Sequence, residues 1–157
     1  MQHPPHPKPP RRHWTNHLAA LLLAWLLAAA WGSVVQTQFN LQALVSLGVP
    51  VPTALRAETT WRDLIGFGPV YAGILAAGWL PALGTAAWLA RRQPAWRSPL
   101  FAAAAGLGMV AAVRAVDAVA PMPNFIDATR SLTGLLLMAV GAVLAGWVYA
   151  RLTRRVG

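Results

Sequence analysis

The chain contains no cysteine and has only four acidic residues among 157. Without cysteine, disulfide frameworks, thiol redox chemistry, thiolate metal sites and cysteine nucleophiles are excluded. Histidine is confined to the N-terminal region, at His3, His6, His13 and His17. His13 and His17 are spaced to share a helical face, but no carboxylate or cysteine accompanies them, and the later apolar stretches hold no histidine pair for a haem. We therefore expect neither a metal nor any other cofactor.

Recognisable catalytic motifs are lacking as well. The sequence contains no G-x-S-x-G, no H-E-x-x-H, no phosphate-binding loop and no dinucleotide-binding fingerprint. Hydrolytic or transfer chemistry would need a nucleophile beside a base, or carboxylates arranged for acid–base work. A membrane enzyme is therefore the least favoured of three function classes, although it stays open as an alternative.

Charge is scarce, whereas apolar residues are abundant. Hydrophobic residues make up 57% of the chain and charged residues 11%, compared with about 25% charged residues in soluble domains. The apolar residues gather in four runs, each long enough to cross about 30 Å of hydrocarbon as a helix. These runs cover residues 14–35, 61–90, 100–120 and 125–150. The predicted fold class is an all-α integral membrane protein with four transmembrane helices in an antiparallel up-down bundle.

The basic residues predict how the chain is threaded through the membrane. Nine of the 13 basic residues flank the runs on a single face: Lys8, Arg11, Arg12, Arg91, Arg92, Arg97, Arg151, Arg154 and Arg155. The other four are matched in number by the four acidic residues, so the whole net charge of +9 lies on that face. The positive-inside rule makes this face, with both termini, cytoplasmic. We expect a bacterial inner-membrane protein whose charge sets its topology, with no nucleic-acid partner.

The chain divides into one membrane domain and two tails. Residues 1–13 are rich in proline, histidine and basic residues and are predicted to form an extended, disordered tail. Residues 14–151 form the transmembrane domain, and residues 152–157 form a short basic tail. The N-terminal basic, apolar and small residues also fit a cleavable signal peptide. N-terminal sequencing of the mature protein distinguishes a first span from a cleaved signal.

The longest connection, residues 36–60, is predicted to lie on the non-cytoplasmic side. Most apolar groups of Asn40–Leu47 share a helical face, and Gly48 ends the pattern. We predict a short amphipathic helix here, which either caps the helix ends or forms a lid. Thr60 and Asp63 fit a capping box that would begin the second span.

Four charges lie on either side of the turn between the third and fourth runs: Arg114, Asp117, Asp127 and Arg130. The turn is short, so the two helices are predicted to be antiparallel neighbours, with Asn124 capping the fourth. The cluster is either a neutral ion-pair network or leaves one arginine free for an anionic group, such as a lipid phosphate. A polar rim from the long loop is predicted to extend it: Gln36, Gln38, Glu58, Arg62 and Asp63.

These features favour two functions. The first is a non-enzymatic accessory, assembly or interaction subunit of a membrane complex. Its partners would be membrane lipids and either another membrane protein or a second copy of the chain. The alternative is a small transporter, channel or lipid-handling protein with an outward-facing charged site on the third and fourth helices. Small residues four apart, such as Gly141 and Ala145, support close helix packing in either case.

Overall fold

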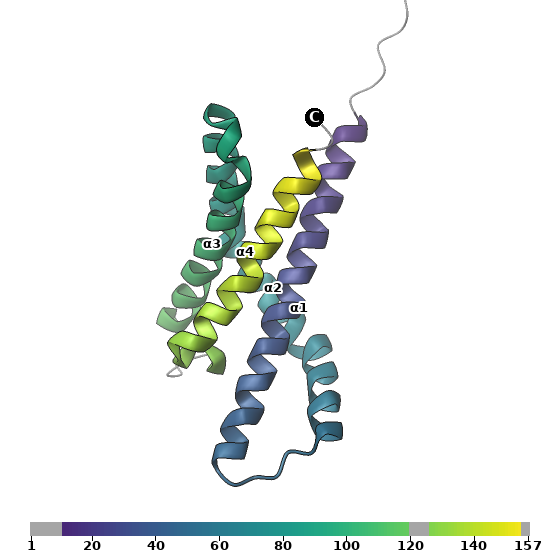
Figure 1. The fold of residues 1–157 in the computed structure, drawn as a ribbon, viewed down its shortest axis with the longest axis vertical. Helices are drawn as coiled ribbons and strands as arrows, with labels where there is room; N and C mark the ends of the chain where they lie inside the picture. The colour runs from purple at the N-terminus through teal and green to yellow at the C-terminus, as the bar shows by residue number, and fades with distance from the viewer. Residues whose placement is uncertain (1–10, 120–125, 155–157) are drawn as a thin grey trace, which may run out of the picture.

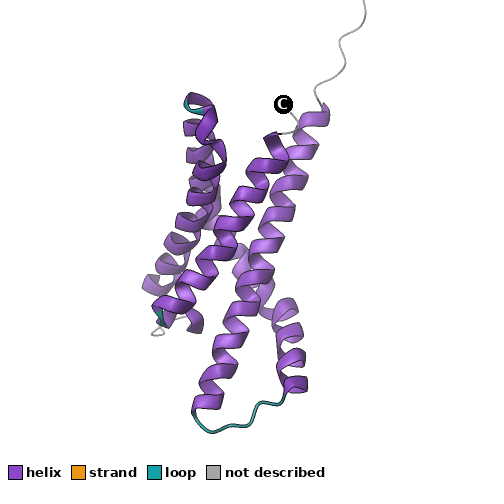
Figure 2. Cartoon of the chain, viewed as in Figure 1, coloured by secondary structure: helices purple, strands orange, loops and turns teal. Residues whose placement is uncertain are grey.

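The computed structural model describes residues 11–119 and 126–154, which are helical apart from short turns and contain no strand. Four helices are long and apolar enough to cross a membrane: α1 (Arg11–Ser46), α2 (Thr53–Arg92), α3 (Arg97–Val119) and α4 (Leu132–Arg154). Two short 3-10 helices precede α3 and α4 (Figures 1 and 2): η1 (Pro94–Trp96) and η2 (Asp127–Arg130). The prediction of an all-α chain with four helices of membrane-spanning length and composition is confirmed.

Each long helix packs against two others. α1 contacts α2 and α4, and α3 contacts α2 and α4. The start of α1 and the end of α4 lie at the same end of the molecule (Figure 1). At this end, α2 and α4 finish and α3 begins with arginine: Arg91, Arg92, Arg97, Arg151 and Arg154. We call it the basic end.

Glycine allows the helix backbones to touch. At the crossing of α2 and α3, a Cβ atom added to Gly78 would overlap the carbonyl oxygen of Gly108. At the contact of α3 and α4, a Cβ atom on Gly146 would meet the backbone of Phe101. Lipid is as apolar as leucine, so helices in a membrane associate through close packing rather than through the hydrophobic effect. Small residues at these positions therefore decide where the helices cross.

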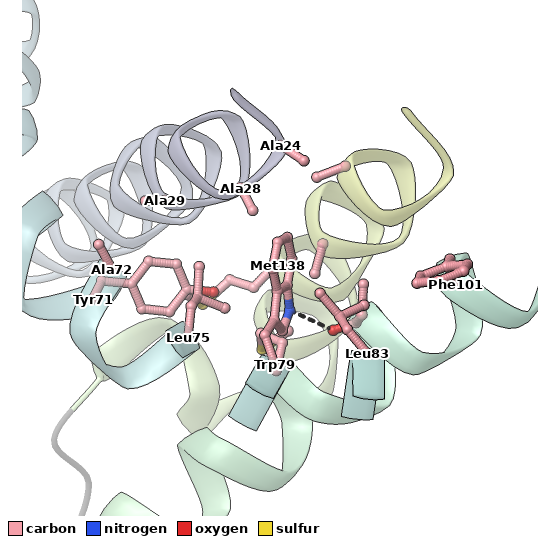
Figure 3. Close-up of a cluster of buried hydrophobic side chains, with 14 of the residues drawn as sticks. Ala24, Ala28, Ala29, Tyr71, Ala72, Leu75, Trp79, Leu83, Phe101 and Met138 are labelled. Atoms are coloured by element: carbon pink, nitrogen blue, oxygen red, sulfur yellow. Dashed lines mark hydrogen bonds between the residues drawn. The ribbon is translucent and has the colours of Figure 1, made fainter. Parts of the chain in front are cut away.

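Tryptophan side chains join three of the four helix pairs by hydrogen bonds. The indole nitrogen of Trp25 donates to the Ala72 carbonyl of α2 over 2.9 Å, and that of Trp31 donates to the Leu137 carbonyl of α4 over 2.8 Å. Trp79 of α2 donates to the Ala105 carbonyl of α3 over 2.9 Å, within the buried apolar cluster of Figure 3. An indole N–H without a partner in an apolar interior is costly. These bonds remove that cost and fix the rotation of each helix.

The predicted short amphipathic helix at Asn40–Leu47 is absent, and this prediction was wrong. α1 continues without a break to Ser46, and the chain turns only at Gly48, whose φ of +83° favours glycine. The polar residues after Val35 do not end the helix because glutamine and threonine are compatible with helical backbone. Instead, the polar side chains of α1 find partners on α2, as described below.

α2 begins earlier than the capping box predicts. It starts at Thr53, directly after Pro52, and runs through Thr60 without interruption. The Thr60 hydroxyl donates to the Arg56 carbonyl one turn back, so it does not cap a helix start. α2 also contains Pro69 and Pro81, which remove hydrogen-bond donors from the helix interior.

α4 begins later than the run 125–150 predicts. Asp127 and Arg130 lie on η2, and α4 starts at Leu132. The Ser131 hydroxyl accepts a 3.0 Å hydrogen bond from the Gly134 N–H, which is the geometry of a helix N-cap. The predicted cap Asn124 lies outside the described residues, as do the first ten residues of the predicted N-terminal tail. The last three residues of the predicted C-terminal tail lie outside them too.

α1 and α2 are too long for the membrane alone. α1 has 36 residues and α2 has 40, whereas α3 and α4 have 23 each. At about 1.5 Å per residue these helices are about 54, 60 and 35 Å long, against about 30 Å of hydrocarbon. Since all four helices meet at the basic end, the excess lies at the other end, where the α1–α2 connection extends past α3 and α4 (Figure 1). We call residues 37–63 the projecting hairpin.

Candidate functional site

The projecting hairpin is held together by polar side chains from both helices. The Thr37 hydroxyl of α1 donates to Asp63 Oδ2 of α2 over 2.7 Å. Further along, Gln38 Nε2 donates to the Thr60 hydroxyl over 3.0 Å, and Arg56 Nη1 donates to Gln38 Oε1 over 2.8 Å. The Gln38 amide thus uses both ends, one as a donor and one as an acceptor. This network aligns the two helices where they leave the four-helix bundle.

Gln36 joins α1 to η2. Its Oε1 accepts a 2.7 Å hydrogen bond from the Ala128 N–H, and the glutamine side chain is buried. Ile126 and Ala128 are fully buried, so η2 folds back on the bundle. Gly134 makes room for this contact, because a Cβ atom there would overlap the Ala128 carbonyl. Gln36 therefore satisfies a buried backbone donor that would otherwise lack a partner.

The predicted rim residues separate into two groups. Gln36, Gln38 and Asp63 connect elements of the structure through the bonds described above. Glu58 and Arg62 lie one turn apart on α2 and form a 2.6 Å ion pair, with side chains 56% and 75% exposed. The structure therefore places three rim residues inside contacts between elements and two on the open surface of the hairpin.

The four charges predicted to form a cluster come from two elements. Arg114 and Asp117 lie on the last turns of α3, where Arg114 is exposed and Asp117 is half-buried. Asp127 begins η2, and Arg130 ends it with an exposed side chain. The expected mirror arrangement on two neighbouring α-helices is thus replaced by one α-helix and one 3-10 turn. The cluster itself stays a prediction.

Three arginines at the basic end stack on aromatic rings. The distances from guanidinium carbon to ring centroid are 4.4 Å for Arg92 and Trp88, 4.9 Å for Arg97 and Phe101, and 4.5 Å for Arg151 and Trp147. Each contact is a cation–π interaction between residues four apart on one helix. These pairs are not among the predicted site residues, although their spacing of four along a helix is visible in the sequence.

An apolar groove runs between α1 and α2 toward the basic end. It has a volume of about 410 Å³ and is walled by Leu21, Leu22 and Trp25 of α1 and by residues 76–87 of α2. Phe101 of α3 and Tyr149 of α4 complete the lining from the other side of the bundle. The volume lies in the range of about 300–1,000 Å³ seen for ligand sites.

Within residues 11–119 and 126–154, no group of three or more histidine, acidic or cysteine side chains is placed to hold a metal ion. Comparison with models of known families, with curated proteins and with solved structures finds no match to this chain.

Proposed function

We propose that the chain is a non-enzymatic accessory or assembly subunit that binds another integral membrane protein through its projecting hairpin. The observation that carries this proposal is the excess length of α1 and α2, which continue together past α3 and α4. A chain that only had to cross the membrane would need about 20 residues per helix. The additional turns give it a structure outside the hydrocarbon that is available for contact with a partner.

The surface of the hairpin supports a protein partner. Its tip carries exposed apolar side chains around the turn, including Leu44, Leu47 and Val49, and Leu47 is 79% exposed. The hydrogen bonds of Gln38 hold the two helices in register beneath this tip. Apolar side chains that gather on an exposed surface are typical of protein interaction sites.

The proposed topology is an antiparallel up-down bundle in a bacterial inner membrane. The asymmetry of basic residues supports cytoplasmic termini and a cytoplasmic basic end. The projecting hairpin then lies on the opposite, non-cytoplasmic side. A cysteine-accessibility assay in intact cells tests this placement, with one cysteine introduced at Leu47 and another at Gln93.

A photo-crosslinking experiment tests the proposed function. A photoreactive residue at Leu47 should form a covalent adduct with one other membrane protein, whereas the same residue at the exposed Leu23 of α1 should not. The change Leu47→Asn with Val49→Asn should abolish co-purification of that partner while leaving the chain monodisperse. An adduct twice the mass of the chain, or no adduct in mild detergent, would contradict the proposal.

A transporter, channel or lipid-handling protein is the second candidate. It is supported by the exposed side chain of Arg114 on α3. The same helix and α2 enclose an apolar hollow of about 530 Å³ whose lining includes Ala111 and Ala115. An arginine at this depth needs a counter-charge or a route to the membrane surface. The change Arg114→Met should abolish ligand binding or flux without unfolding the chain; wild-type behaviour in such assays would end this alternative.

A further inference from the structure

We propose that the apolar groove between α1 and α2 binds one acyl chain of an anionic glycerophospholipid, with the lipid phosphate held by Arg91 and Arg97 at the basic end. This site is separate from the projecting hairpin, which lies at the opposite end of the bundle. The proposal does not depend on the accessory function. It rests on the shape of the groove, the register of the arginines and the distribution of charge.

The groove suits an acyl chain because its lining is apolar and because it lies in the part of α1 and α2 that is apolar enough to span a membrane. Its walls are almost wholly apolar, and Leu22 of α1 and Leu80 of α2 are themselves exposed at its edges. Because it lies within the spanning part of α1 and α2, the molecules that meet it are lipids. A chain in the groove gains van der Waals contacts, including contacts with the rings of Trp25 and Phe101.

The helix register places arginine at the rim of the groove. Along α2, the lining residues end at Ala87, and Arg91 follows one turn later on the same face. On α3, Arg97 lies one turn before Phe101, and its guanidinium lies 4.9 Å from the centroid of that ring. Its Nη2 donates to the Thr153 hydroxyl of α4 over 2.8 Å. These contacts fix Arg97 beside Phe101, on the α3 side of the groove. Exposed Arg91 lies on the α2 side.

Among residues 11–119 and 126–154, no acidic side chain lies at the basic end to supply a counter-charge. All four acidic residues lie toward the other end: Glu58 and Asp63 on the hairpin, Asp117 on the last turn of α3 and Asp127 on η2. Arg97 is half-buried, and its Nε atom has no hydrogen-bond partner among the described residues. A partly buried cation is stabilised by a nearby anion. Phosphate accepts charge-assisted hydrogen bonds from arginine, and anionic lipid headgroups are known to occupy basic pockets between transmembrane helices.

Titration of the full-length chain in detergent tests the proposal. Phosphatidylglycerol and phosphatidylcholine with identical acyl chains are added, and native mass spectrometry gives the dissociation constant of the first bound lipid. We expect phosphatidylglycerol to bind about tenfold or more tightly than phosphatidylcholine. Each basic side chain near an anionic headgroup contributes about 1 kcal/mol, so Arg91→Gln and Arg97→Gln should each weaken phosphatidylglycerol binding about fivefold. Arg91 is exposed on the surface, so its replacement leaves the helix contacts intact.

A pair of glycine variants tests the groove itself. Gly84 lines the groove, and a Cβ atom there meets no neighbour within 4 Å, so Gly84→Leu introduces a side chain at the groove from an open backbone position. Gly73 is equally open on α2 but does not line the groove, which makes Gly73→Leu the matched control. We expect Gly84→Leu to weaken binding of both lipids at least tenfold and Gly73→Leu to leave it unchanged. Equal binding of the two lipids, or wild-type binding by Gly84→Leu, would overturn the proposal.

Discussion

At the crossing of α2 and α3, Gly78 and Gly108 bring two backbones into direct contact, whereas at the projecting hairpin long polar side chains bridge the gap between α1 and α2. The first contact lies in the spanning part of the helices, where the two backbones touch and cannot separate without losing van der Waals contacts. The second lies beyond the ends of α3 and α4, where water competes for each hydrogen bond. One helix pair is therefore specified by shape and the other by polar pairing.

The largest loss of stability is expected at the contact between Gly78 and Gly108, where the two helix backbones touch. Gly78→Leu forces a side chain into the Gly108 carbonyl, which is backbone and cannot rotate away. We expect a loss of about 3 kcal/mol or more in the free energy of unfolding, at the upper end of overpacking effects. Denaturant unfolding in micelles, followed by tryptophan fluorescence, measures it. Gly73→Leu, at an open position of the same helix, should leave the free energy of unfolding near that of the wild type. Equal losses for the two variants would show that the close backbone contact at Gly78 has no special effect.

A smaller effect is expected at Gln36, where a polar group serves a buried contact. Gln36→Leu leaves the buried Ala128 N–H without its acceptor, which costs about 1–3 kcal/mol. Hydrogen exchange of the Ala128 amide should become faster, since η2 loses its bond to α1. Gln42→Leu, at an exposed position on the same helix, is the control and should leave both measurements unchanged.

A smaller loss of stability is expected when a hydrogen bond of tryptophan between two helices is removed. Trp79→Phe keeps an aromatic ring but removes the donor to the Ala105 carbonyl. Hydrogen bonds between membrane helices are worth about 0.6–1.7 kcal/mol, so we expect a loss of about 1 kcal/mol in the unfolding free energy. Trp61→Phe replaces an exposed indole and should cost less. A larger loss for Trp61→Phe than for Trp79→Phe would contradict this account of the bundle.

The smallest effect is expected on the open face of the hairpin. Glu58→Gln removes the ion pair with Arg62, whose side chains are mostly exposed to solvent. Exposed pairs one helical turn apart contribute about 0.3–0.5 kcal/mol and weaken with salt. Thermal unfolding in low and high salt should show a difference of that size at most. A loss as large as that of Gln36→Leu would mean that the pair has a role beyond the surface.

The main features of the fold were predictable because they depend on composition over long windows. The charge-free runs around Leu22, Leu75, Gly106 and Ala142 each predict a helix of spanning length, and the structure has all four. Element boundaries were harder to predict. Polar residues often follow a span, so the sequence predicts a loop from Gln36 onward, yet α1 continues through Gln36 and Gln38. Their partners, Ala128 and Thr60, are distant in sequence, so no local pattern could reveal them.

The candidate sites divide in the same way. The arginine–aromatic pairs at the basic end follow a spacing of four and were readable from sequence. The apolar groove was not, because it depends on how far α1 and α2 diverge and on the rotation of Phe101 and Tyr149 toward it. Likewise, the predicted place of Asp127 and Arg130 on the fourth helix depended on where that helix starts, and Ser131 caps it after both residues.

The sequence by itself determined that the chain has four helices able to cross a membrane and that its excess positive charge gathers at one end. The first follows from the cost of placing charge in hydrocarbon, which acts on each segment separately. The second follows from which connections between the apolar runs carry the basic residues. The tertiary structure decided which polar side chains pair, where glycine brings helices together and where a groove opens. These depend on helix rotation and crossing, which are set by contacts between residues far apart in the chain, such as Gly78 with Gly108 and Gln36 with Ala128.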